Sequence, residues 1–111
     1  ARATFEEMQT TWCLVGHSHI PFACRDSDNG ALFTEAVPDS PVELSSEKLI
    51  VNPGGVGQPR DSDPRASYAV FDSTSNTVTH HRVEYEVART QEKMRRHDLP
   101  PFLIERLAYG R

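Results

Sequence analysis

Short apolar runs separated by turn residues make up most of the chain up to residue 84. Residues 12–15 are continuously apolar, and partly alternating segments follow at 20–24, 31–36, 48–51, 67–71 and 77–84. Runs of four to eight residues bounded by turn signals are typical of strands, so the pattern predicts a sheet. Because the alternation is only partial, it does not specify the register of that sheet.

Turn residues between these segments indicate how they connect. Asn29-Gly30 lies between the segments 20–24 and 31–36 and predicts a hairpin, because this dipeptide favours tight turns. Residues 38–47 are polar and predict a surface connection, so that 25–47 forms a hairpin and surface connection. A turn is also expected at 73–76, between the last two strands.

Helical spacing appears at both ends of the chain. Residues 4–8 predict a short helix with Thr4 as its N-cap. Residues 86–110 predict a helical tail of two amphipathic helices, 86–97 and 102–109, the second ended by Gly110. These helices either cover a sheet with their charged side in solvent, or bind a partner or membrane surface through Lys93, Arg95 and Arg96. The same pattern assigns Phe102, Leu103 and Leu107 to the core.

Composition narrows the class of protein. The chain has 111 residues, of which 37% are hydrophobic, so the core is lean for a domain of this size. The formal net charge is −4 and there is no long basic run, so nucleic acid is not indicated as a partner. No apolar run is long enough to span a membrane, and the absence of a starting Met fits a truncated or processed chain.

Two cysteines are too few for a disulfide scaffold and lack the spacing of a zinc or redox motif. We therefore expect reduced thiols and a cytoplasmic protein, with Cys13 in the core and Cys24 at the edge of a loop.

The motif G-H-S-H-I-P at residues 16–21 directly follows the first apolar run. In an extended backbone, His17 and His19 would lie on the same side of the chain, and neutral imidazole is the commonest protein ligand for transition metals. The pair therefore predicts half of a metal site. The alternative is one buried, hydrogen-bonded histidine beside one exposed histidine.

Other chemistries fit these residues poorly. Ser18 lacks the G-x-S-x-G context of a nucleophile elbow, and the glycines at 54–57 lack the lysine and following helix of a P-loop. Asp61, Asp63 and Asp72 lack the glycine and terminal glutamate of a calcium loop.

A second motif, N-P-G-G-V-G-Q-P-R at residues 52–60, is followed by A-S-Y at 66–68. This order after G-H-S-H-I-P resembles the calcineurin-like metallophosphoesterases, in particular the small bacterial and archaeal phosphodiesterase branch. Ser18 stands where that branch usually has threonine, and Gly55 where it usually has serine. Asn52, Gly54 and Gly55 correspond to its structural loop.

The resemblance implies an α+β fold, the C-terminal part of a four-layer α/β/β/α sandwich, here a mixed sheet plus two C-terminal helices. It covers most of residues 1–111. It implies that His17 and His19 each ligate one of two divalent ions (Mn, Fe, Zn or Ni), and that a metal-bound hydroxide hydrolyses a phosphomonoester or phosphodiester. Arg60 and Arg65 are candidate substrate-binding residues, and salt bridges to neighbouring aspartates are the alternative.

The family's other ligand motifs, D-x-H, G-D-x-x-D, G-N-H and an isolated G-H, do not occur in this sequence. We therefore expect the chain to be the C-terminal portion of a metallophosphoesterase, inactive in isolation. Two alternatives are a non-catalytic remnant or binding module that has lost the metal centre, and a subunit completed by another chain.

The lean core also predicts an interface. A sheet that packs against a second sheet in the parent fold would here leave an apolar face uncovered. We expect the remainder of the enzyme or another copy to cover a face bearing part of the set Leu14, Ile50, Tyr68, Val70 and Val83.

Overall fold

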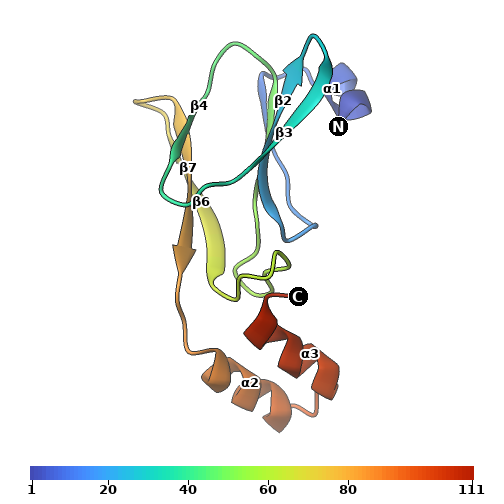
Figure 1. Cartoon of the computed structure of the whole chain (residues 1–111), viewed down its shortest axis with the longest axis vertical. Coiled ribbons are helices and arrows are strands. Elements are labelled where there is room, and N and C mark those ends of the chain that lie inside the picture. Colours follow the sequence, from blue (N-terminus) through green and yellow to red (C-terminus); the bar gives the residue numbers. More distant parts are fainter.

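The computed structural model describes residues 1–111 as two β-sheets packed face to face, with helices at both ends of the molecule (Figure 1). The strands are β1 (Trp12–Leu14), β2 (Pro21–Ser27), β3 (Gly30–Glu35), β4 (Pro41–Glu43), β5 (Leu49–Pro53), β6 (Ala66–Asp72) and β7 (Thr77–Val83). The helices are α1 (Arg2–Glu7), α2 (Val87–Arg96), α3 (Pro101–Glu105) and the 3₁₀ helix η1 (Arg106–Tyr109). The predicted α+β class is confirmed.

The first sheet has the strand order β1-β5-β2-β3 and is mixed, because β1 runs parallel to β5 while the other pairs are antiparallel. The second sheet is antiparallel, in the order β4-β7-β6. The predicted hairpins at β2–β3 and β6–β7 are confirmed. The surface connection expected at 38–47 also contains a short strand, because β4 pairs Val42 with Val78 at the sheet edge. A strand of three residues is too short to show a period.

The main core lies between the two sheets, and β5 is buried on both faces. Leu49 and Val51 belong to the cluster between the sheets, with Ala23, Leu44 and Val78. Ile50 points to the opposite face and packs with Cys24 and Phe5 of α1. This double burial explains the continuous apolar run Leu49–Val51. The inner faces of the two sheets therefore cover each other, and the expected uncovered apolar face stays a prediction.

The N-terminal helix begins at Arg2, two residues before the predicted cap at Thr4, and its N-cap Ala1 makes no side-chain hydrogen bond. Packing decides its position, because Phe5 is 2% exposed against the outer face of the first sheet.

The prediction that Cys24 lies at the edge of a loop is wrong, whereas Cys13 packs against the core cluster as expected. Cys24 is fully buried in β2, which extends beyond the predicted strand end, and Cys13 is half-buried. Burial raises the pKa of the Cys24 thiol. Both residues pair with Ile50 from opposite sides, which places them two strand spacings apart, about 9.6 Å. That separation exceeds the reach of a disulfide, and both thiols are free.

The C-terminal helices pack on each other beyond one end of the sheets and do not cover a sheet face (Figure 1). Leu107 and Ile104 are buried, whereas Phe102 is 65% exposed, so the prediction that Phe102 lies in the core is wrong. Gly110, with φ 63°, ends η1 as predicted. The helices are all too short and too polar to cross a lipid bilayer.

Candidate metal centre

The two histidines of the G-H-S-H motif lie in a turn that follows β1. The Ser18 amide donates to the carbonyl oxygen of Gly16 (2.9 Å), and His17 between them has φ 73°. An i to i+2 hydrogen bond around a residue with positive φ has the features of a classic γ-turn, which is rare and strained. Strained backbone in a folded protein is a feature of functional sites.

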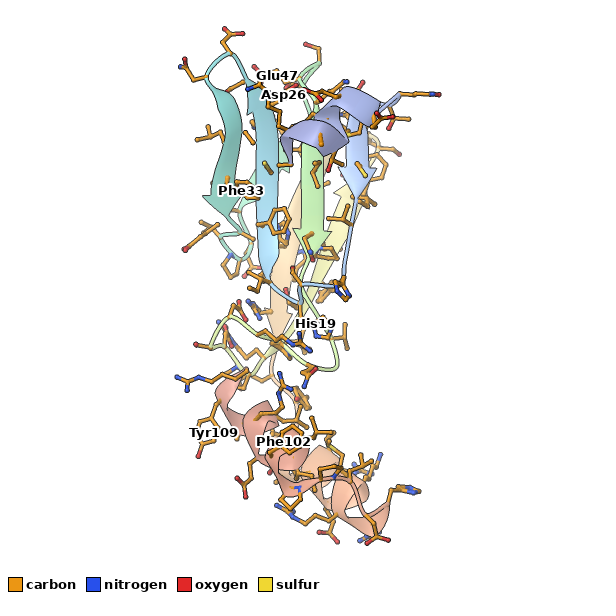
Figure 2. The ribbon with its side chains drawn as sticks, turned by 90° about the vertical axis from the view of Figure 1, so that its right-hand side faces the viewer. His19, Asp26, Phe33, Glu47, Phe102 and Tyr109 are labelled. Carbon is orange, nitrogen blue, oxygen red and sulfur yellow. The ribbon has the colours of Figure 1, made fainter.

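The extended backbone expected for this pair is wrong. Strand β1 ends at Leu14, and His19 also has positive φ, 60°. His17 is exposed, whereas His19 is half-buried at the end of the sandwich that faces the helices (Figure 2). The two rings are therefore presented by a tight turn and not by the pleat of a strand.

Hydrogen bonds orient His19 and select its tautomer. Its Nδ1–H donates to the carbonyl oxygen of Gln58 at 2.7 Å, because a carbonyl oxygen can only accept. Its own carbonyl oxygen accepts from the amide of Arg60 at 3.2 Å. In the neutral ring, Nε2 then carries the free lone pair, which is the arrangement typical of a metal-ligating histidine.

Asn52 joins the two sequence motifs. The residue is 1% exposed, and its Nδ2 donates to the Gly16 carbonyl oxygen (3.0 Å) and to Ser18 Oγ (2.9 Å). Its Oδ1 accepts from the amide of Gly54 (2.9 Å). Asn52 thus uses its side chain to hold the histidine turn against the glycine turn. Ser18 provides the hydroxyl that Asn52 needs and has no geometry of a nucleophile.

The glycines of the second turn differ in whether the structure has space for a Cβ atom at their positions. Gly54 has φ 83°, and a Cβ there would lie 2.7 Å from Ser67 Oγ and 2.8 Å from Ser67 Cβ. At Gly55 a Cβ would make ordinary contacts of 3.4 Å with the Cβ and Cγ of His19. Gly54 is therefore required by the backbone, whereas Gly55 borders the His19 ring.

The two arginines of the loop that follows β5, Arg60 and Arg65, have different side-chain partners. Arg65 pairs with Asp63, with 2.6 Å between Nη2 and Oδ2, so it forms the salt bridge given as the alternative to substrate binding. Hydrogen bonds from Arg65 hold the pKa of Asp63 below its ordinary value. Arg60 is exposed; its guanidinium donates only to the side chain of Gln58 (Nη2 to Oε1, 3.1 Å) and has no carboxylate partner.

The donor set suits part of a metal centre and not a whole one. No three His, Cys, Asp or Glu side chains of the structure converge to hold a metal ion. His81 pairs with Asp39 at 2.7 Å, and His80 is buried against the Asn52 carbonyl. His17 and His19 are therefore the candidate ligands that this chain can offer.

No pattern in the sequence pointed to Gln58, because it acts through its backbone carbonyl. The alternation of Val78, His80 and Arg82 toward one face of β7 was a usable signal for buried polar residues behind the site.

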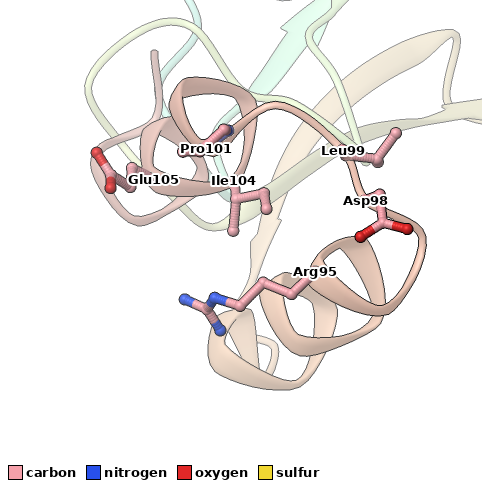
Figure 3. Close-up of a pocket in the computed structure, with 6 residues that line it drawn as sticks. All are labelled: Arg95, Asp98, Leu99, Pro101, Ile104 and Glu105. Atoms are coloured by element: carbon pink, nitrogen blue, oxygen red, sulfur yellow. The ribbon is translucent and has the colours of Figure 1, made fainter.

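A separate cavity of about 330 Å³ lies between α2 and α3. Figure 3 shows its lining residues, which are Arg95, Asp98, Leu99, Pro101, Ile104 and Glu105. None of them belongs to the histidine turn or to the loop that contacts it.

The chain is similar to proteins about twice its length or more. It is 42% identical over 98 residues to an uncharacterized protein of Methanocaldococcus jannaschii, a match covering 87% of this chain and 38% of that protein. No protein-family model matches it. A hypothetical protein from Pyrococcus horikoshii shares the fold, with a TM-score of 0.64 at 21% identity over 99% of this chain and 35% of that one.

A solved metallophosphoesterase from Sphaerobacter thermophilus is more similar, with a TM-score of 0.93 and 43% identity. The match covers 99% of this chain and 47% of that enzyme, so the chain spans less than half the length of the relatives described here. In both sequence and fold, the chain corresponds to the C-terminal portion of a metallophosphoesterase.

Proposed function

We propose that this chain supplies two imidazole ligands, His17 and His19, to the dinuclear centre of a metal-dependent phosphoesterase. The observation that carries the proposal is the His19 ring, whose Nδ1–H is held by the Gln58 carbonyl while Nε2 is left free. The same hydrogen bond would also suit the alternative, a histidine with a purely structural role, and the histidine variants below distinguish the two. The strained turn at His17, two residues earlier, supports the same role.

His17 and His19 would each hold one divalent ion, of Mn, Fe, Zn or Ni. Such ions, when bound, neutralise charge on phosphoryl oxygens and acidify water. The chain's own contribution is to fix the direction of the His19 ring with Nε2 left free, and to hold the backbone turn that carries His17. Asn52 fixes the turn that carries His17, and Gln58 fixes the His19 ring.

The substrate in this proposal is a phosphomonoester or phosphodiester, and Arg60 is its candidate contact. The Arg60 guanidinium is exposed and free of carboxylates, so its donors are available to phosphoryl oxygens. Arg65 is the weaker candidate, because its donors are already taken by Asp63.

The remaining ligands would come from the rest of the enzyme, which we place against an open apolar edge of the sandwich. Two adjoining cavities of about 180 and 190 Å³ lie between the edge strands β1 and β6. Trp12, Leu14 and Phe71 line their mouth, and Leu14 is 69% exposed. Strand β1 has a neighbour on one side only, so its other edge can accept a further strand.

This placement changes the predicted interface. The residues of the expected set lie on three different faces of the molecule. Ile50 is buried under α1, Leu14 faces the space between the sheets, and Tyr68, Val70 and Val83 are partly exposed on the outer side of the second sheet. We therefore assign the interface with the rest of the enzyme to the groove at Leu14.

A chimera tests the proposal. Residues 1–111 replace the matching portion of the Sphaerobacter enzyme, and hydrolysis of bis-p-nitrophenyl phosphate is measured with Mn²⁺. We expect metal-dependent turnover that His17→Ala and His19→Ala each lower at least a hundredfold, while the matched surface variant Arg96→Ala leaves it unchanged. The isolated chain should bind Mn²⁺ or Zn²⁺ weakly and should not hydrolyse the ester.

A chimera that folds but lacks turnover would reject the proposal. That result would instead favour the alternative, a non-catalytic remnant or assembly module that keeps the fold without the metal centre. Turnover that survives both histidine variants would reject the ligand assignment alone.

A further inference from the structure

The inner face of β7 changes from apolar to polar as the strand approaches the histidine turn. Val78 and His80 are each 2% exposed, and the Arg82 side chain is 6% exposed. These three residues alternate along the strand and so share one face. Burying an imidazole and a guanidinium between two sheets is costly unless their donors are satisfied.

The donor of His80 reaches the strand that carries Asn52. His80 Nε2–H donates to the Asn52 carbonyl oxygen at 2.9 Å, from the second sheet to the first. The side chain of the same asparagine holds Gly16 and Ser18, the two residues on either side of His17. Asn52 therefore links β7 to the strained turn, through its carbonyl oxygen on one side and its side-chain amide on the other.

The donors of Arg82 reach the loop that orients His19. Its guanidinium pairs with Asp61 and donates to the Arg65 carbonyl oxygen at 3.1 Å. Its Nε also lies 3.8 Å from Asp63 Oδ2. These contacts fix residues 61–65, and the same loop provides the Gln58 carbonyl and the Arg60 amide that contact His19.

The arrangement carries an energetic cost that packing alone does not explain. His80 Nδ1 and Asp61 Oδ1 are buried and have no hydrogen-bond partner, and they account for two of the three such side-chain atoms in the structure. Burial also lowers the pKa of Arg82. An apolar residue at either position of β7 would avoid these penalties, so the polar pair indicates a function.

We propose that His80 and Arg82 are positioning residues for the two candidate ligands, His80 for the His17 turn and Arg82 for the His19 ring. The inference rests on the proposed function, since it treats His17 and His19 as ligands. In this arrangement the second sheet sets the directions of imidazoles that emerge from the first. Removing such supporting contacts around a metal site ordinarily lowers metal affinity about 10- to 100-fold.

The tautomer of His19 tests the Arg82 half of the proposal without metal or substrate. In the ¹⁵N-labelled chain at about pH 8, where histidine is neutral, long-range ¹H–¹⁵N spectra should show His19 protonated at Nδ1. Arg82→Met should convert His19 to a mixture of tautomers, and Arg82→Lys, which keeps the charge but loses the planar fork, should give an intermediate result.

Zinc affinity tests the His80 half, by titration of the chain. His80→Leu removes the donor and should weaken Zn²⁺ binding about tenfold. His80→Gln keeps an N–H donor and should stay within twofold of the parent chain. Val78→Ala is the matched control on the same face, and it should lower the melting temperature without changing the tautomer or the zinc affinity.

Folded Arg82→Met and His80→Leu variants that keep the Nδ1–H tautomer and the parent zinc affinity would overturn the proposal. Should Arg82→Met fail to fold, Asp61→Asn removes the same ion pair with nearly the same shape and decides the question in its place. The tautomer and zinc measurements need no substrate. An inactive chimera would therefore reject the phosphoesterase function without deciding whether His80 and Arg82 position the two histidines.

Discussion

His17, Gly54 and Gly110 show that single backbone conformations determine the shape of the site. All three have positive φ. Gly110 lies so close to Asp63 that a Cβ would come within 2.6 Å of its backbone. At such positions the identity of one residue has consequences that composition and hydrophobic pattern do not reveal.

The two neighbouring glycines of the second turn should respond differently to substitution. Gly54→Ala places a Cβ within 2.8 Å of Ser67 at positive φ and should lower the free energy of unfolding by about 1–3 kcal/mol. In Gly55→Ala the added Cβ would lie 3.4 Å from His19, and the free energy of unfolding should change by less than about 0.5 kcal/mol. Urea denaturation measures both, and equal losses would contradict the prediction.

The lowered pKa of Asp63 predicts a pH dependence of stability. Because its folded pKa lies below the unfolded value, mainly through hydrogen bonds from Arg65, the ionised form favours folding. This contribution is present above about pH 5 and is lost as the pH falls through the folded pKa.

We therefore expect the free energy of unfolding to fall more steeply between about pH 5 and pH 2 in the parent chain than in Asp63→Asn. The pKa of Asp72 is also lowered, by the amide of Thr74, but its effect is common to both chains and cancels in the difference. Parallel pH profiles would show that Asp63 makes no such contribution.

At the scale of elements, the helical tail is held by few contacts. Leu107 and Ile104 are buried, and Gln91 Nε2 donates to the Ile104 carbonyl oxygen at 2.8 Å to join α2 to α3. The amide of Ser62 donates to the Gly110 carbonyl oxygen at 2.9 Å and joins the tail to the loop beside His19. The charged side of α2 contributes exposed pairs such as Arg96 with Glu92.

Two substitutions in the tail should therefore differ strongly. Leu107→Asp buries an unpaired carboxylate and should unfold the tail or aggregate the chain, whereas Arg96→Ala should change stability by less than about 0.5 kcal/mol. Phe102→Ala, at a position 65% exposed, should also cost little, about 1 kcal/mol or less. Circular dichroism during chemical denaturation distinguishes these outcomes.

The whole molecule is more extended than a compact domain of its length. Its radius of gyration is 16.2 Å and its extents are 49 × 29 × 20 Å, against about 13 Å expected for a compact domain of 111 residues. Only 16 residues are buried, while Leu14, Phe33 and Phe71 remain about half or more exposed. Exposed apolar surface of this kind is typical of an interface, and we propose that further chain covers it.

The isolated chain should therefore bind an environment-sensitive dye and self-associate at high concentration. Leu14→Lys should reduce both without loss of stability, because Leu14 lines the groove but is 69% exposed. Val83→Lys, on the outer face of the second sheet, is the matched control and should reduce them less. A monomer in light scattering that binds no dye would contradict the groove assignment.

The sequence by itself determined the fold class, the hairpins, the end of the tail at Gly110 and the order of the two motifs. These features follow from local chemistry: Asn29-Gly30 favours a turn, and the apolar run around Ile50 requires burial. The family resemblance also came from contiguous residues, and similarity to a solved enzyme confirms it.

Tertiary structure alone decided the geometry of the site. The turns at His17 and His19, the Gln58 carbonyl that selects a tautomer, and the buried His80 and Arg82 all depend on partners 17 to 39 residues away along the chain. Packing also positioned β4, buried Cys24 and exposed Phe102. Hydrophobic period specifies which face of an element is buried, but it carries no information about which distant backbone atom a side chain will meet.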